Sequence, residues 1–168
     1  MAEAKEQTEQ SAKVVEPKAA EKASALVSGK VAIVLVRGLV KVRGEIKQTI
    51  WNLGLRRVNQ CVVVEMNASI QGMLRKAKDY VTWGPLSDSD YNTLVEARGE
   101  EYHGRETDSK GKYKYNFVEV NGKKYKKVLR LNPPRKGYGR NGIKRSFNTG
   151  GALGTRGEKI ADLIERML

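Results

Sequence analysis

Residues 31–83 read VAIVLVRGLVKVRGEIKQTIWNLGLRRVNQCVVVEMNASIQGMLRKAKDYVTW. The stretch opens with a continuous apolar run at residues 31–36, which is typical of a buried strand. β-Branched and aromatic residues return at 61–65 and at 80–83, and they predict two more strands. Between these runs the apolar residues follow helical spacing. The pattern therefore predicts the order strand–helix–strand–helix–strand.

Each of the two predicted helices has one apolar stripe. In the first, Ile46, Ile50 and Leu53 recur at helical spacing, and Gly54 is expected to end the helix. In the second, Asn67 is placed to cap the N-terminus. Its stripe consists of Ile70, Met73, Leu74 and Ala77. Both stripes must be buried, so we expect an α+β fold in which both helices cover one face of a three-stranded sheet.

Further elements are expected after residue 84. Ser87 and Asp90 resemble a capping box at the start of a third helix that ends at Gly99, and residues 100–112 are expected to form a mobile loop. Asn121-Gly122 lies between two β-prone runs, so residues 113–131 predict a β-hairpin. Residues 132–157 have no regular pattern and are expected to be disordered without a partner. The last helix has its stripe at Ile160, Leu163, Ile164 and Met167.

These patterns divide the chain into four parts. Residues 1–29 are expected to be a disordered, charge-balanced tail, and residues 30–84 the compact core. Residues 85–131 carry the third helix and the hairpin insert. Residues 132–168 form a basic extension, rich in Gly and Pro, that closes with the short C-terminal helix.

The charge of the chain points to a polyanionic partner. The sequence has 32 Lys and Arg against 19 Asp and Glu, for a net charge of +13 and a pI near 9.9. Residues 110–145 hold thirteen of the basic residues and a single acid, Glu119. A segment of this charge repels itself in water unless a polyanion neutralises it, and RNA or DNA is the expected partner.

Fifteen side chains are the candidate nucleic-acid contacts. Arginine matches phosphate oxygens with a planar fork, lysine supplies a point charge, and an aromatic ring stacks on unpaired bases. Tyr138 and Phe147 are the aromatic residues expected to stack in this way. The fifteen candidates are Arg37, Lys41, Arg43, Lys47, Arg56, Arg57, Arg75, Lys78, Arg135, Lys136, Tyr138, Arg140, Lys144, Arg145 and Arg156.

Catalytic and metal sites have little support in the sequence. Cys61 and His103 are the lone cysteine and histidine, too few for a zinc site, and Cys61 is expected to be a buried, inert thiol in a reducing compartment. Residues 137–142 match G-x-G-x-x-G, but no strand leads into them, so a dinucleotide fold is rejected. We expect no enzyme activity, cofactor or metal. No membrane span or secretory signal is expected either.

The core motifs resemble a known family. Residues 31–38, 46–58, 70–74 and 80–84 resemble the large-subunit ribosomal proteins of the L-thirty family, whose eukaryotic relative is the L-seven protein. Residues 129–137, 142–145 and 150–154 look like the C-terminal extension of the archaeal form. The insert is shorter than the helical insert of archaeal members. The N-terminal tail is longer than in many of them, without the strong basicity of the eukaryotic extension.

The resemblance implies a ferredoxin-like core and a structural role in the large ribosomal subunit. It implies binding to large-subunit ribosomal RNA beside neighbouring ribosomal proteins in the cytoplasm, without catalysis, membrane attachment or a homo-oligomer. By similarity, the core contacts RNA through Arg37, Arg43, Arg56 and Arg57. The extension contacts it through Arg135, Lys136, Arg140, Lys144 and Arg145.

Two other functions fit parts of the sequence. A free-standing nucleic-acid chaperone or chromatin protein would bind duplex DNA as tightly as RNA. A small RNA-modifying enzyme would need a pocket with a pair of perturbed titratable groups, and the sequence offers no such pair.

Overall fold

The computed structural model describes residues 29–107, 109–113, 115 and 117–168. Apart from Gly29, the predicted N-terminal tail lies outside the described residues. In chain order the strands are β1 (Lys30–Leu35), β2 (Gln60–Glu65), β3 (Val81–Pro85), β4 (Phe117–Val120), β5 (Lys123–Lys126), β6 (Val128–Arg130) and β7 (Gly154–Thr155). The helices are α2 (Gly44–Asn52), α3 (Ala68–Ala77), α4 (Asp88–Arg98) and α5 (Ile160–Glu165), with 3-10 turns η1 (Gly142–Lys144), η2 (Phe147–Thr149) and η3 (Gly157–Lys159).

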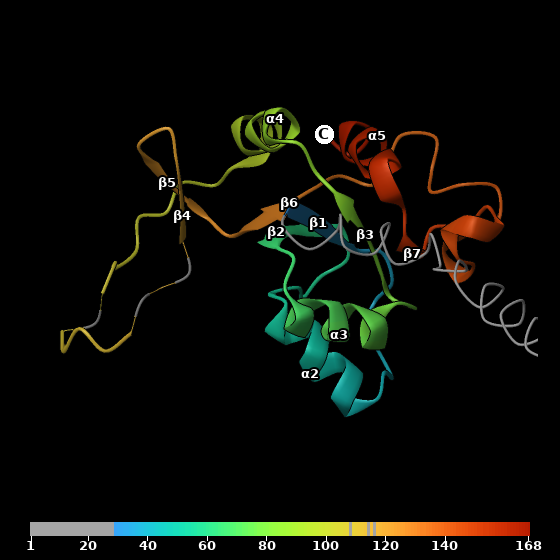
Figure 1. Cartoon of the computed structure of the whole chain (residues 1–168), viewed down its shortest axis with the longest axis horizontal. Helices are drawn as coiled ribbons and strands as arrows, with labels where there is room; N and C mark the ends of the chain where they lie inside the picture. The colour runs from blue at the N-terminus through green and yellow to red at the C-terminus, as the bar shows by residue number, and fades with distance from the viewer. Residues whose placement is uncertain (1–28, 108, 114, 116) are drawn as a thin grey trace, which may run out of the picture.

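The described elements form three layers around a mixed sheet. The strand order is β6-β2-β1-β3-β7, with α2 and α3 below the sheet and α4 and α5 above it in Figure 1. Strand β1 pairs antiparallel with both β2 and β3, so the first three strands and two helices form one β-α-β-α-β unit. The predicted α+β class and ferredoxin-like core are confirmed.

The two faces of β1 explain its unbroken apolar run. Val31, Ile33 and Leu35 belong to the core cluster on the side of α2 and α3. Ala32 and Val34 belong to the cluster on the side of α4 and α5. Because side chains alternate along a strand, a strand covered on both faces must be apolar at every position.

Helices α2 and α3 cover the same face, as predicted. Ile50 and Leu53 of the first helix and Leu74 and Ala77 of the second are buried in one cluster with β1. Asn67 is the N-cap residue of α3, but its side chain makes no cap hydrogen bond. The expected side-chain cap is therefore absent there, and burial of the apolar stripe stabilises the helix.

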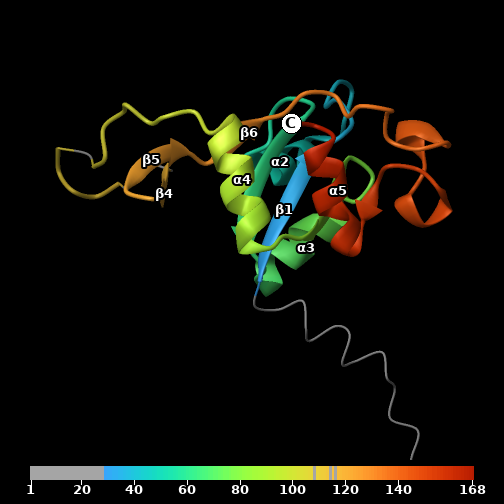
Figure 2. The same ribbon diagram turned by 90° about the horizontal axis from the view of Figure 1, so that it is seen from above.

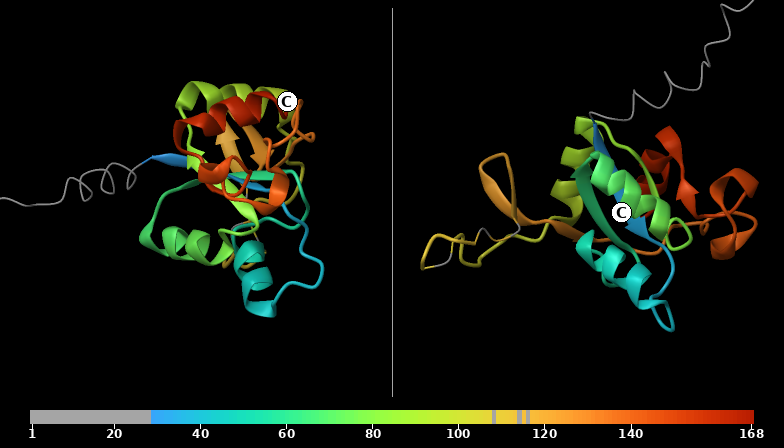
Figure 3. Two further views of the ribbon diagram at one scale, coloured as in Figure 1. Left: turned by 90° about the vertical axis from the view of Figure 1, so that its right-hand side faces the viewer. Right: turned by 60° about the horizontal axis from the view of Figure 1, so that its bottom comes forward.

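The opposite face of the sheet is also covered. Leu94 of α4 and Leu163 of α5 are both buried in the second core cluster, and the two helices lie over the same face in Figure 3. The sequence predicted these helices but not their place over the sheet. The core is therefore a sheet between two helical layers.

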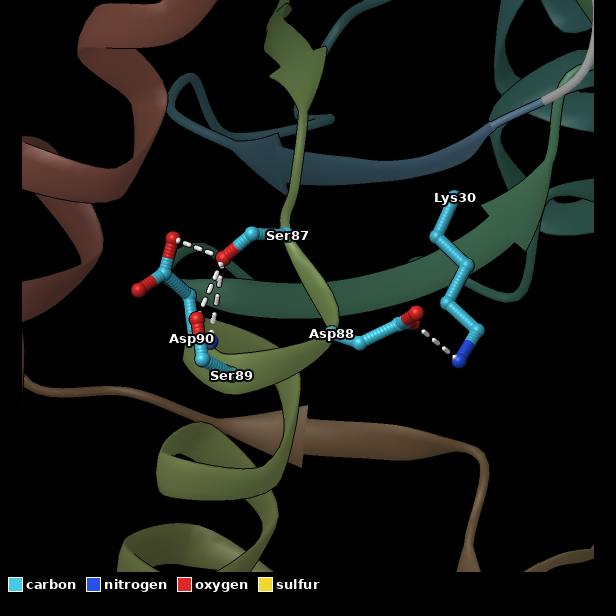
Figure 4. Close-up of polar contacts among 5 residues, drawn as sticks. All are labelled: Lys30, Ser87, Asp88, Ser89 and Asp90. Carbon is cyan, nitrogen blue, oxygen red and sulfur yellow. Dashed lines mark hydrogen bonds and ion pairs between the residues drawn. The ribbon is translucent and has the colours of Figure 1, made fainter.

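The predicted cap of α4 is present. The Ser87 Oγ accepts a hydrogen bond from the Asp90 N–H at 3.2 Å and donates one to the Asp90 carboxylate at 2.7 Å (Figure 4). Nearby, Lys30 at the start of β1 pairs with Asp88 at 2.7 Å, which joins the first strand to the first turn of α4. Both side chains of this pair are exposed, so the pair contributes little to stability.

The predicted hairpin is confirmed only in its first part. Strands β4 and β5 pair around the Asn121-Gly122 turn, but the expected second strand divides after Lys126. Its continuation, β6, pairs with β2 and buries Leu129 in the second core cluster. Together with β7, which runs parallel to β3, this makes the main sheet five-stranded rather than three-stranded. The strand leaves the hairpin because burying Leu129 in the core is more favourable than extending the exposed pairing of β4 and β5.

The hairpin and the extension leave the body at opposite ends, as Figure 2 shows. The extension returns to the sheet at several points, because Ala152 and Leu153 pack against Val36 and the Arg156 N–H donates to the Trp83 carbonyl at 2.8 Å. The prediction that residues 132–157 are disordered in the free protein stays a prediction. So does the division of the chain into four parts.

Candidate nucleic-acid interface

Three loops meet at one edge of the sheet. The register places Val34 opposite Cys61 and Leu35 opposite Val81, so the end of β1 lies beside the starts of β2 and β3. Backbone bonds close this edge, since the Asn59 N–H donates to the Leu35 carbonyl at 2.8 Å. We call residues 36–43, 56–59 and 75–80 the basic edge.

The first part of the basic edge is the loop after β1. The Arg37 guanidinium donates to the Asp79 carbonyl at 3.2 Å and lies 5.2 Å from the centre of the Tyr80 ring, so it is held beside the start of β3. Lys41 and Arg43 are exposed farther along the loop. Lys41 has a positive φ of 57°, which marks the tip of the turn.

The second part is the turn that leads into β2. The Gln60 side-chain oxygen accepts the backbone N–H groups of Arg56 and Arg57 at 2.8 and 2.9 Å. This fixes the backbone while both arginine side chains stay exposed. Arg75 and Lys78 are exposed at the C-terminal end of α3, which leads to the same edge.

The extension is anchored at this edge by Tyr138. Its hydroxyl donates to the Asn59 side-chain oxygen at 2.7 Å, and its ring packs with Val36, Ala152 and Leu153. Farther along the extension, the Arg145 carbonyl accepts a hydrogen bond from the Ala152 N–H at 3.0 Å. This bond closes the loop at residues 145–152, directly after the basic residues. The exposed candidate contacts of the extension are Arg135, Lys136, Arg140, Lys144 and Arg145.

Eleven of the fifteen candidates are exposed, and Arg37, Lys47 and Tyr138 are half-buried. Within the described residues, none of the fifteen takes part in an ion pair. Free cations on a surface raise the local concentration of anions and are available to phosphates. The structure therefore brings the loop after β1, the turn before β2 and the end of α3 to one edge, with the extension attached beside them.

Arg156 differs from the other candidates because it is buried. Its guanidinium lies 4.4 Å from the centre of the Phe147 ring and donates to the Ala152 carbonyl at 3.3 Å. Burial lowers the pKa of Arg156 from its usual value. Both Arg156 and Phe147 are engaged inside the extension, as Tyr138 is at Asn59, so each has a structural role that the sequence did not indicate.

The positive charge of the hairpin is partly balanced. Lys126 and Arg130 reach the Glu100 carboxylate at 2.7 and 3.4 Å, and Lys124 pairs with Glu106. The hydrogen bond from Lys126 is the main cause of a lowered pKa at Glu100. The expectation of an unbalanced basic run across residues 110–145 is therefore wrong for the hairpin. Glu100 and Glu106 lie before the hairpin in sequence and approach it only in the fold, whereas Glu119 lies within it, 3.9 Å from the Lys124 ammonium.

The cysteine and the histidine of the chain lie in very different surroundings. Cys61 is fully buried, which confirms the expected burial, and burial raises the pKa of its thiol to about 12. His103 has a side chain that is 84% exposed. Within the described residues, no group of three or more His, Cys, Asp or Glu could hold a metal, and no helix could cross a membrane.

The sequence of this chain matches one protein family and several of its named members. The family model described as Ribosomal protein L30p/L7e matches residues 31–81, from β1 to the first residue of β3. Proteins named large ribosomal subunit protein uL30 match most of the chain. The one from Methanococcus vannielii is 38% identical over 82% of this chain and 98% of its own, and the one from Methanopyrus kandleri is 41% identical over 79% and 100%. The one from Nanoarchaeum equitans is 42% identical over 82% of this chain and 97% of its own.

The chain belongs to the ribosomal protein L30p/L7e family. The resemblance noted in the sequence is thereby confirmed.

Two residues of the L30p/L7e chain organise the basic edge without having been singled out from the sequence. Asn59 has a positive φ of 64° and accepts the Tyr138 hydroxyl, and Gln60 holds the arginine turn. An asparagine two residues before a predicted strand is a signal for such a turn, because Asn adopts the left-handed conformation more readily than most residues.

Proposed function

We propose that this chain is a structural constituent of the large ribosomal subunit that binds and stabilises folded large-subunit ribosomal RNA through phosphate contacts. The observation that carries the proposal is the basic edge, where cations from three loops converge without acidic partners in the described residues. Its relatives are named large ribosomal subunit protein uL30. The proposed location is accordingly the large subunit in the cytoplasm, beside neighbouring ribosomal proteins.

The basic edge also offers apolar surface. Val40 is 84% exposed and Val58 is 43% exposed, and both lie among its arginines and lysines. Apolar side chains of this kind can pack against sugars and bases, while the cations neutralise phosphates and fix the orientation of the protein. The exposed side chains that we propose as phosphate contacts are Lys41, Arg43, Arg56, Arg57, Arg75, Lys78, Arg135, Lys136, Arg140, Lys144 and Arg145, together with the half-buried Arg37 and Lys47.

The salt dependence of binding tests the proposal. Each phosphate that the protein neutralises contributes roughly −0.7 to −0.9 to the slope of log K against log salt. A variant with glutamine at Arg135, Lys136, Arg140, Lys144 and Arg145 should bind large-subunit ribosomal RNA with a slope that is shallower by up to about 3.5–4.5. An unchanged slope would count against phosphate contacts by the extension.

A matched control uses two lysines that already have partners. Lys123 and Lys124 pair with Glu101 and Glu106. Replacing both with glutamine removes as much charge as replacing Arg135 and Lys136, yet it should change the slope far less. Equal effects of the two double variants would show that only net charge matters.

The alternative of a free-standing chaperone or chromatin protein is tested by competition and fractionation. That function predicts that duplex DNA competes as well as ribosomal RNA at equal salt. The ribosomal function predicts that the protein sediments with the large subunit on a sucrose gradient. Recovery in the free fraction alone would contradict it.

A further inference from the structure

A pocket opens between the end of α2 and the edge strand β6, and Arg56 is the one of the fifteen candidate contacts that lines it. Its volume is about 370 Å³, within the range of roughly 300–1,000 Å³ for pockets that hold small ligands. The wall on one side is Trp51 and the turn after it, and on the other side Lys126, Lys127 and Arg130.

Trp51 is an unusual wall for such a pocket. Its side chain is 43% exposed although tryptophan is among the most apolar residues, and it lies off the stripe that α2 buries. The Lys47 ammonium lies 4.8 Å from the centre of the ring and covers part of it. The exposed indole therefore offers a surface on which a flat aromatic ligand can stack.

The charges around the pocket select for an anion. Four cationic residues, Arg56, Lys126, Lys127 and Arg130, line it against one acid, Glu100. Glu100 accepts a hydrogen bond from Lys126 at 2.7 Å and pairs with Arg130 at 3.4 Å, so it positions these cations and leaves an excess of three positive charges.

We propose that this pocket binds one unpaired nucleotide of the RNA, with its base against Trp51 and its phosphate at Arg130 and Arg56. An exposed ring beside a cluster of cations matches the two halves of a nucleotide, a flat base and an anionic phosphate. Arg56 belongs both to the basic edge and to this pocket, so one strand of RNA can pass from one to the other. The inference rests on the proposed RNA-binding function and adds a site to it.

Substitution of Trp51 tests the pocket, with deproteinised large-subunit ribosomal RNA from an archaeon as the probe. Trp51→Ala should weaken binding about 5- to 150-fold, the range expected from loss of one stacked base, and should leave the salt slope unchanged. Trp51→Phe should retain most of the affinity. Arg56→Gln, at a lining arginine that has no acidic partner among the described residues, should instead flatten the slope by about 0.7–0.9, because it removes one phosphate contact. Tyr113→Ala, at a side chain that is 69% exposed in the insert, is the control and should bind as the wild type does.

Chemical probing of the RNA in the same complexes completes the test. One or a few nucleotides protected by the wild-type protein should become reactive with Trp51→Ala and stay protected with Tyr113→Ala. Wild-type affinity and an unchanged footprint for Trp51→Ala would overturn the proposed nucleotide site but not the proposed RNA-binding function. A pocket that holds an acidic peptide instead of a nucleotide would give that same result. Absence of salt-dependent binding by the wild type would overturn the proposed function and the pocket together.

Discussion

The Tyr138 hydroxyl donates a hydrogen bond to the Asn59 side chain at 2.7 Å, between residues that lie 79 positions apart. Asn59 is the last residue before β2, and Tyr138 of the extension packs against two clusters of buried core residues. This hydrogen bond therefore ties the basic extension to the basic edge.

Tyr138→Phe should remove this bond and keep the ring. The loss of a half-buried hydrogen bond should lower the free energy of unfolding by about 0.5–1.5 kcal/mol, measured by urea denaturation. The backbone amide of Ala152 should then exchange hydrogen faster, because the ring packs against that residue. Tyr113→Phe, at an exposed ring, is the control and should have no effect on either measurement.

Gly84→Ala should destabilise the packing of β3 against the C-terminal segment. A Cβ at Gly84 would collide with the Gly157 carbonyl oxygen and lie 2.9 Å from the Ile160 Cβ. We expect a loss of about 1–3 kcal/mol or more, seen as a lower midpoint in urea. Gly72→Ala is the matched control, because nothing lies within 4 Å of that Cβ in α3 and alanine should stabilise the helix by about 0.5–1 kcal/mol. Equal stability of the two variants would contradict the close approach at Gly84.

Arg156 and Arg135 should have opposite phenotypes. Arg156→Ala removes the contacts with Phe147 and the Ala152 carbonyl, so it should cost roughly 1–3 kcal/mol of stability without changing the salt slope of RNA binding. Arg135→Ala, at an exposed side chain, should leave stability within about 0.5 kcal/mol and flatten the slope by about 0.7–0.9. A flatter slope in a stably folded Arg156→Ala protein would show that the buried arginine also reaches RNA.

The Cys61 thiol should be unreactive in the native protein. With a pKa near 12, on the order of one thiol in 10,000 is ionised at pH 8, and the side chain is fully buried. In the native protein, a thiol-specific reagent should therefore label Cys61 only as fast as the fold opens around it. In denaturant, the same reagent should label Cys61 rapidly. Labelling should be faster in Gly84→Ala, because that variant opens more often. Rapid labelling of the native wild type would contradict the burial of Cys61.

The same thiol predicts a dependence of stability on high pH. The pKa of Cys61 is raised in the folded protein, so above about pH 9 the unfolded chain releases a proton that the native state keeps. The contribution of this group to the unfolding free energy is constant below pH 9 and falls as the pH rises from 9 towards 12. Urea titrations of the wild type and Cys61→Ala across that range should show a steeper decline in the wild type.

Local residue patterns were sufficient to predict much of the core from the sequence. The apolar run at 31–36, the stripes of α2 and α3 and the Ser87 cap all depend on neighbours within a few positions, and each agrees with the structure. Such features are recoverable because side chains point to a given face at a fixed period along a helix or strand. The cations of the basic edge were likewise visible as Lys and Arg residues in the sequence.

Four features depended on contacts between distant residues. They are the cover of the second face by α4 and α5, the departure of β6 from the hairpin, the pairing of Glu100 with Lys126 and Arg130, and the burial of Arg156 against Phe147. No local period distinguishes a free lysine from a paired one, or an exposed arginine from one that lies on a ring. Whether a lysine or arginine is free, paired or buried depends on which surfaces come together when the chain buries its apolar side chains. Those surfaces meet only in the tertiary structure.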